Sequence, residues 1–365
     1  MIRRSIKIVF PLLFFTCMYC SCNYNHNTCV VENTKIILEK STLKEFLLDE
    51  NTPVDWLNIG IMHTTDSCFF LLYNLYTGEL HYYDYYTCNY VKKHRLRNGY
   101  HGFTYDGNRF FFHDRYSNIL HVYDSNLTLS ESVPLPFDKS VNKSVRPSTS
   151  DFYNPAFKKD SLYYLTNYWI GESKDTRHYL VAYHPQSKAL DYLCEYPELY
   201  NKAHWGGGMM KLGYSCINQN KADVVFSFPI SHELYVYHIN DQSTKQYCAG
   251  SSRIKSIPPY AKDKSKNCTD DDQINYFLES NSYGPVVYDQ YRKLYYRVAE
   301  TPAKNGRRAS IIILDDLFNY KGEALLDDRN GTTIIPVPDG VLAPYLPGQE
   351  TEKALRYQLY QIPEL

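Results

Sequence analysis

The chain has 365 residues and carries 39 Lys and Arg against 40 Asp and Glu, which gives a formal net charge of −1. A charge this close to balance excludes the basic surface that nucleic-acid binding requires. Since one hydrophobic core rarely grows beyond about 250–300 residues, the length indicates several domains or a repeat architecture. The 37 Tyr and 17 Phe favour strands and an all-β fold.

The first residues have the pattern of an export signal. Three basic residues precede a short apolar run at residues 8–15, which is too short to span a bilayer as a helix. Three cysteines and a polar stretch follow at residues 17–28. A cysteine directly behind a short apolar segment resembles the lipobox of bacterial lipoproteins, in which the thiol is acylated and becomes the new N-terminus.

We predict that residues 1–21 form a lipoprotein signal peptide and that Cys22 carries the lipid, because the small Ser21 precedes it; Cys17 is the alternative. Residues 22–33 are polar and predict a flexible tether. The expected location is the bacterial outer membrane, facing either the periplasm or the cell surface. The cysteines beyond the anchor are predicted to be small apolar fillers with at most one or two disulfides.

A hairpin of two short apolar strands recurs along the chain. Its strands are apolar on both faces, so each sheet needs a neighbour on each side. The ends of the first two hairpins, Asp84 and Asp124, are 40 residues apart, which suits one four-stranded blade. The pattern predicts a β-propeller of six blades, with five or seven as alternatives. The second strands of the six hairpins lie at 80–84, 120–124, 180–184, 234–238, 311–315 and, more weakly, 355–359.

The last hairpin has no further strand after it, while Thr34–Leu38 reads as a strand without a blade of its own. We therefore predict that the N-terminal strand pairs in the last blade and closes the ring, so that the propeller covers residues 34–365. A loop insertion at about 251–282 is rich in Lys, Ser and Asp. Asp270–Glu279 within it is predicted to be a short helix, and the insertion is the candidate for a cap or a partner-contacting loop.

Several short motifs occur in order between Val224 and Glu323. They are Val225-Phe226-Ser227-Phe228, Leu234-Tyr235-Val236-Tyr237, Ala249-Gly250-Ser251-Ser252, Tyr288 to Arg297, Ile312-Ile313-Leu314-Asp315 and Gly322-Glu323. With these motifs the stretch resembles domain-of-unknown-function family 4221. The resemblance implies a propeller-like lipoprotein of the kind typical of Bacteroidota, without an assigned activity. The sequence departs from the family pattern at His184 and His238, where Asp is usual.

The densest cluster of polar and aromatic residues lies between Tyr288 and Arg297. One interpretation is structural: Asp289 and Arg292 pair across a turn and fix the register of a hairpin. The functional interpretation is that Arg292, Tyr296 and Arg297 face the central channel and bind an anionic group through bidentate hydrogen bonds.

Two further stretches have a functional and a structural interpretation. His204 and Trp205 precede three glycines, so an exposed indole would be a stacking platform for a sugar; the alternative is an entry loop whose Trp packs between blades. The basic run Lys92–Arg97 would contact lipid phosphate or an acidic glycan; the alternative is an edge strand whose charge prevents strand pairing.

The motifs of known catalytic sites are incomplete. His232-Glu233 lacks the second His of a zinc-protease helix, and Gly213-Tyr214-Ser215-Cys216 lacks the closing Gly of a nucleophile elbow. We therefore predict no catalytic residues, cofactor or metal.

The sequence favours a monomeric binding module for a glycan, a peptide or an envelope protein. The alternatives are a propeller hydrolase or lyase and a scaffold that docks on an outer-membrane complex. An acid and a base from different blades within about 5–9 Å at the channel mouth would indicate an enzyme. A mouth lined by Tyr and Arg without such a pair would indicate binding.

Overall fold

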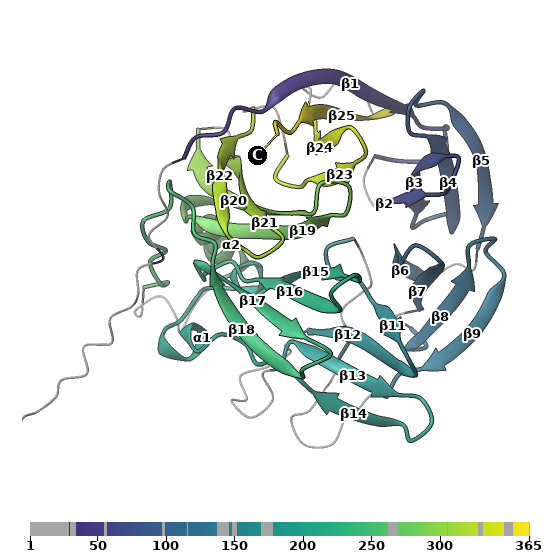
Figure 1. Cartoon of the computed structure of the whole chain (residues 1–365), viewed down its shortest axis with the longest axis horizontal. Coiled ribbons are helices and arrows are strands. Elements are labelled where there is room, and N and C mark those ends of the chain that lie inside the picture. The colour runs from purple at the N-terminus through teal and green to yellow at the C-terminus, as the bar shows by residue number, and fades with distance from the viewer. Residues whose placement is uncertain are drawn as a thin grey trace, which may run out of the picture.

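The computed structural model describes residues 29, 34–54, 57–96, 99–114, 116–136, 146–147, 152–168, 178–261, 269–304, 306–327, 331–346 and 353–364. The sheets they form stand in a ring around a central axis (Figure 1). The predicted signal peptide, both candidate lipid attachment sites and the tether, except Cys29, lie outside these residues. Among the described residues, no helix is both long and apolar enough to cross a membrane.

Each sheet is one antiparallel blade, as the recurring hairpins predicted, and the blades follow one another along the chain. Blade 1 consists of β2 (Leu57–His63), β3 (Cys68–Asn74), β4 (Glu79–Asp84) and β5 (Tyr90–Arg95). Blade 2 consists of β6 (Tyr100–Tyr105), β7 (Arg109–Asp114), β8 (Ile119–Asp124) and β9 (Leu129–Pro134). Blade 3 consists of β10 (Arg146–Pro147), β11 (Phe157–Lys159), β12 (Leu162–Tyr168), β13 (Leu180–His184) and β14 (Ala189–Tyr192).

The second half of the ring repeats the arrangement. Blade 4 consists of β15 (Tyr214–Asn218), β16 (Asp223–Ser227), β17 (Glu233–His238) and β18 (Ser243–Cys248). Blade 5 consists of β19 (Ser282–Asp289), β20 (Leu294–Ala303), β21 (Gly306–Asp315) and β22 (Tyr320–Leu325). Blade 6 consists of β23 (Ile335–Val337), β24 (Gly340–Pro344), β25 (Ala354–Gln361) and β1 (Glu39–Leu47). The prediction of a six-bladed propeller is confirmed.

The ring closes as predicted, but through later residues. The strand that pairs with β25 is β1, in which Lys44 lies opposite Tyr357. Residues 34–38, which were expected to form this strand, instead run beside blade 5, where Ile36 N donates to Glu323 O at 3.1 Å. The correction has a steric reason. A Cβ on Gly322 would come within 2.8 Å of Thr34 O, so this glycine lets the incoming chain lie against β22.

The blades pack through side chains that are buried on both sheet faces. In β16 all five residues are buried, and in β17 the four central residues are buried. Aromatic rings connect neighbouring blades: Tyr179 of blade 3 meets Phe226 of blade 4 edge to face, with ring centroids 5.2 Å apart. A strand that is apolar on both faces is therefore one that lies buried between two neighbouring blades.

The repeated Asp at the end of the third strand organises the turn that follows. Asp84 accepts a hydrogen bond from Thr87 N at 2.8 Å, and Asp315 accepts one from Leu317 N at 2.9 Å. Short Asp side chains favour such turns because they satisfy main-chain N–H groups locally. In blade 4, where His238 replaces Asp, its ring instead bonds Asp223 at 2.7 Å. The Asp or His at the end of the third strand therefore stabilises the local turn or strand pairing of its blade.

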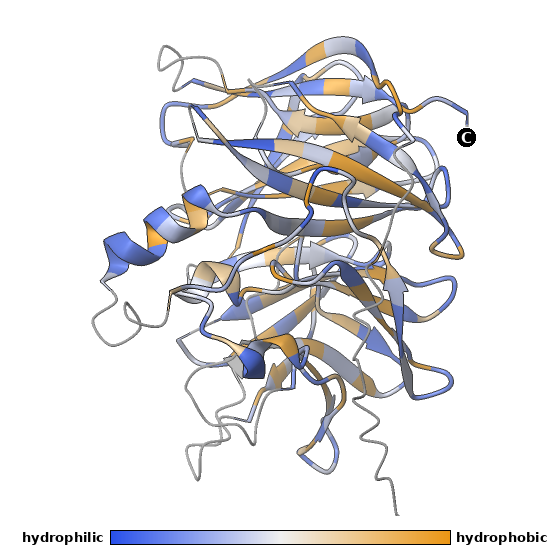
Figure 2. Cartoon of the chain, turned by 90° about the vertical axis from the view of Figure 1, so that its left-hand side faces the viewer, coloured by the Kyte–Doolittle hydropathy of each residue, from blue (hydrophilic) through white to orange (hydrophobic). Residues whose placement is uncertain are grey.

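The insertion contains the predicted helix, α2 (Asp270–Glu279), with the predicted bounds. Thr269 and Asp272 form a reciprocal capping box at its N-terminus. Figure 2, which views the ring edge-on, shows α2 projecting from one face of the ring. Two shorter helices, α1 (Leu199–Lys202) and η2 (Gly208–Met210), lie between blades 3 and 4, and α2 packs against η2.

Strand direction gives the ring two distinct faces. Because every blade is antiparallel, the inner strands β2, β6, β15, β19 and β23 all end at one face, which we call the mouth face. The fourth strands end at the opposite face, which we call the tether face. β18 ends there at Cys248, which forms a disulfide with Cys29. It is the one disulfide among the residues that the structure describes.

Candidate functional site: the channel mouth

A cavity of about 340 Å³ lies on the channel axis and is lined by all six blades. Its walls are the ends of the inner strands and the first turns that follow them, except in blade 3, where residues that precede β11 line it. This volume is in the usual range of small-molecule sites. The residues that line it include Ile59, Gly60, Ile61 and His63 of blade 1, Phe103–Gly107 of blade 2, Phe152, Pro155 and Ala156 of blade 3, Cys216, Ile217, Gln219 and Asn220 of blade 4, Val287, Tyr288, Gln290 and Tyr291 of blade 5 and Pro336 of blade 6.

Tyrosine rings are the main polar aromatic groups of the cavity. Burial raises the pKa of Tyr291 to about 12, and burial also raises the pKa of Tyr105 and of Tyr288. All three phenols are therefore protonated and uncharged at neutral pH. Each ring combines an apolar face with a hydroxyl that can donate or accept a hydrogen bond.

Amide side chains supply the other polar groups of the mouth. Gln219, Asn220 and Gln290 line the cavity and are exposed to solvent. Gln219 Nε2 also donates to Asp106 O at 2.8 Å, a contact that connects blade 4 to blade 2 across the channel. Amides donate and accept without adding charge, so they suit an uncharged polar ligand.

Asp106 is the only carboxylate among the described residues that line the cavity, and its oxygens are already used. Oδ2 accepts from Arg109 Nη2 at 2.8 Å, and Oδ1 accepts from Arg109 N at 2.7 Å. The exposed His63 ring meets Tyr291 edge to face at 5.7 Å. Asp106 of blade 2 and His63 of blade 1 both line the cavity, and among the described residues no second carboxylate joins them there.

A shallow, open groove continues the mouth outward. It has a volume of about 580 Å³ and runs along the first turns of blades 1 and 2. His63, Tyr105 and Gly107 line both hollows. A ligand longer than the central cavity therefore has a polar path from the channel axis to the rim.

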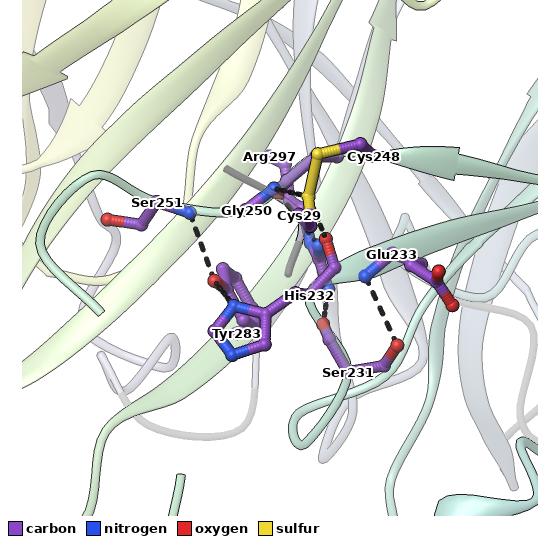
Figure 3. Close-up of a disulfide and its surroundings, with 10 residues drawn as sticks. Cys29, Ser231, His232, Glu233, Cys248, Gly250, Ser251, Tyr283 and Arg297 are labelled. Carbon is purple, nitrogen blue, oxygen red and sulfur yellow. Dashed lines mark hydrogen bonds between the residues drawn. A yellow bond between two sulfur atoms is a disulfide. The ribbon is translucent and has the colours of Figure 1, made fainter. Parts of the chain in front are cut away.

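Arg297, which was expected at the channel, is fully buried between blades 4 and 5. Its guanidinium donates to Ser227 Oγ at 3.0 Å, Ala249 O at 2.9 Å and Ser231 O at 2.7 Å, and lies 3.8 Å above the centre of the Tyr283 ring (Figure 3). Burial lowers its pKa to about 10, so it stays charged at neutral pH. Because its donors are used within the fold, the expectation that it holds an anionic ligand is wrong.

Arg292 and Tyr296 also serve the hairpin and the adjacent blade. Arg292 Nη1 bonds Asp289 Oδ2 at 2.8 Å, and its Nη2 donates to Pro338 O of blade 6 at 2.9 Å. The buried Tyr296 hydroxyl donates to the same Asp289 oxygen at 2.8 Å. The pairing of Asp289 with Arg292 is confirmed, and the alternative interpretation, a site for an anion, has no support here.

Trp205 is 6% exposed, so it is not the expected stacking platform. Its indole N–H donates to Leu199 O at 2.9 Å, and the His204 ring lies 5.5 Å from the ring of Tyr260. The glycines that follow serve α2, since a Cβ on Gly206 would come within 2.7 Å of Tyr276. The structure favours the alternative interpretation, an entry loop whose Trp packs in the core.

Residues 92–95 of the basic run lie in β5, the outermost strand of blade 1, as the edge-strand interpretation expects. All of its residues are exposed. Lys93 pairs with Glu79 at 3.0 Å. Arg97, the last residue of the run, lies outside the described residues.

The motifs quoted for the family resemblance meet at the seam between blades 4 and 5. Ser251 Oγ donates to the buried Glu323 at 2.6 Å, and Ser252 N donates to the same carboxylate at 2.9 Å. Ala249 accepts from Arg297, and Ser251 N donates to the Tyr283 hydroxyl at 3.0 Å (Figure 3). We call these residues, Ala249–Ser252, Tyr283, Arg297 and Glu323, the blade 4–5 seam.

The model of the family described as a domain of unknown function (DUF4221) matches residues 35–325. A solved structure of a member of this family from Bacteroides vulgatus is 19% identical, covers 90% of this chain and 98% of its own, and superposes with a TM-score of 0.73. A structure from Bacteroides fragilis is 13% identical, covers 91% and 100%, and has a TM-score of 0.52. These similarities concern the fold. Comparison with curated proteins finds no match.

Proposed function

Because the chain belongs to the DUF4221 family and folds as a six-bladed propeller, we propose that it is a lipid-anchored protein of the bacterial envelope that binds an uncharged, hydroxyl-rich ligand, a short glycan, at the channel mouth. The observation that carries this proposal is the composition of the cavity. Tyrosine rings and amides converge there from several blades, while the one carboxylate among the described lining residues, Asp106, is bonded to Arg109. Sugars bind through stacking on aromatic faces and hydrogen bonds to such groups.

The disulfide supports the proposed location and orientation. Disulfides persist in oxidising compartments such as the periplasm, and Cys29–Cys248 ties the N-terminal segment to the tether face. The seven residues that follow Cys22 up to Cys29 reach at most about 25 Å when extended. An anchor at Cys22 would therefore hold the tether face near the lipid and turn the channel mouth away from it.

Metabolic labelling with palmitate tests the anchor. We expect Cys22→Ala to abolish labelling and Cys17→Ala to retain it, because only the thiol at the cleavage site is acylated. Continued labelling of the Cys22 variant would move the anchor to Cys17 or Cys20, and unlabelled wild-type protein would contradict the proposal.

Binding is tested with the full-length protein in detergent on arrays of glycans and of peptides. We expect glycan binding that His63→Ala combined with Gln290→Ala weakens at least about tenfold, since both exposed side chains line the cavity. Tyr116→Ala is the matched control, because Tyr116 is 86% exposed and lies in the second turn of blade 2, at the tether face. Binding to peptides alone, or equal loss in the control, would contradict a glycan site at the mouth.

A further inference from the structure

A second cluster of polar residues lies at the tether face, where the ring closes. Asp49 follows the closing strand β1, while Glu79 and His81 begin β4 of blade 1. One nitrogen of the histidine and one oxygen of each carboxylate lie within 4.8 Å of one another. One imidazole and two carboxylates form a ligand set suited to divalent first-row metals, whereas Mg²⁺ and Ca²⁺ prefer oxygen ligands alone.

The histidine gives independent evidence that the cluster is a site. The His81 side chain is 1% exposed, and its Nε2 has no hydrogen-bond partner in the described structure. This atom points at Glu79 Oε2, 3.6 Å away, beyond hydrogen-bond distance. A buried ring nitrogen without a partner is costly unless a ligand completes it.

Lys93 at present supplies the positive charge of the cluster. Its Nζ lies 3.0 Å from Glu79 Oε2 and 3.5 Å from Asp49 Oδ2. Its side chain is 40% exposed, so it can turn outward into solvent. The ammonium therefore competes with a metal for the same two carboxylates.

Blade 2 provides an internal comparison. His121 occupies the same place in β8 as His81 does in β4, the third residue of the strand. The first residue of the strand is Glu79 in blade 1 but Ile119 in blade 2, and the cross-strand partner is Lys93 in blade 1 but Ser132 in blade 2. His121 bonds Ser132 at 3.0 Å. The repeat thus keeps the histidine in both blades. In blade 1 two carboxylates, Asp49 and Glu79, gather around it, whereas in blade 2 the nearby carboxylate is Asp114 and the histidine bonds Ser132.

We propose that Asp49, Glu79 and His81 bind a divalent transition metal such as Zn²⁺, which displaces the Lys93 ammonium and clamps the closing segment of the ring to blade 1. The metal joins residues that are distant in sequence, so its binding stabilises the closed ring. This inference does not depend on the ligand of the channel mouth.

Zinc binding to metal-stripped full-length protein, measured by competition with a chromophoric zinc indicator, tests the proposal. We expect one site in the wild type, at least about tenfold weaker binding in His81→Gln and Glu79→Gln, and tighter binding in Lys93→Ala. His121→Gln is the matched control and should bind as the wild type does. Zinc should also raise the melting temperature of the wild type but not that of His81→Gln.

Equal zinc affinity in the wild type and in His81→Gln would overturn the proposal, and so would weaker binding in Lys93→Ala. Should His81→Gln fail to fold, Asp49→Asn gives the same test at a side chain that is 38% exposed. Unchanged affinity in that variant would equally overturn it.

Discussion

The blade 4–5 seam and the channel mouth both contain polar and aromatic side chains. The seam uses them to hold two blades together, whereas the mouth leaves them open to a ligand. At the seam, Arg297, Tyr283 and Glu323 are buried and directed at main-chain groups and serines of the neighbouring blade or loop. At the mouth, His63 and Gln290 are exposed and line a cavity. The polar groups of the seam are satisfied by the fold, whereas those of the mouth can exchange water for a ligand.

In this protein, a stretch of sequence that is rich in polar and aromatic residues marks a junction between two blades and not the ligand site. The seam takes Ala249–Ser252, Arg297 and Glu323 from three of the six motifs quoted for the family resemblance, together with Tyr283. The mouth takes only a few residues from each blade. Selection for a shared fold can therefore explain the shared motifs without reference to a shared ligand.

Removing the charged centre of the seam should have the largest effect. Arg297→Met keeps much of the side-chain volume but leaves Ala249 O and Ser231 O without their donor. We expect a loss of about 3–5 kcal/mol in the free energy of unfolding, because buried acceptors lose a charged partner. Urea unfolding of both proteins measures it.

Arg95→Met is the control for that substitution, since Arg95 is exposed on β5. It should change the free energy of unfolding by less than about 0.5 kcal/mol. A comparable loss in both variants, or a loss below about 1 kcal/mol for Arg297→Met, would remove the distinction between the seam and an ordinary surface arginine.

The sequence predicted the fold because blade packing leaves a local signal. Strands such as β16 and β17 are buried on both faces, and an apolar pattern on both faces reports this directly. The helix Asp270–Glu279 was found through its acidic first turn. The closing strand was misplaced because residues 34–38 are extended along blade 5 before β1 begins, and extended backbone looks alike in both roles.

The site was not predicted, because its residues are brought together only by the ring. His63, Gln219 and Gln290 each follow or end an inner strand, and no local pattern distinguishes them from other turn residues. One signal was available once a propeller was predicted: the first turn after each inner strand must face the channel. A comparison of those turns across the blades would have identified the residues of the mouth. The search for local clusters of polar and aromatic residues instead identified Arg297 and Trp205.

The disulfide lies at the edge of the seam, and its removal should have a smaller effect on the free energy of unfolding than the loss of Arg297. Cys29–Cys248 joins residues 219 apart and lies beside Gly250, whose N–H points at Cys29 Sγ at 3.3 Å (Figure 3). Replacing both cysteines by serine should lower the free energy of unfolding by about 2–4 kcal/mol, less than the effect of Arg297→Met in most of that range. Cys88→Ser, at a free cysteine, is the control.

Reduction separates the loss of the covalent bond from the effect of the substitutions. Dithiothreitol should bring the melting temperature of the wild type down to that of the double serine variant and leave the variant unchanged. Glycan binding at the mouth should persist in both, because the disulfide lies on the tether face and contributes no residue to the cavity. Loss of glycan binding on reduction would show that the tether face and the mouth face are coupled. The residues that stabilise the fold would then not be independent of those that bind the ligand.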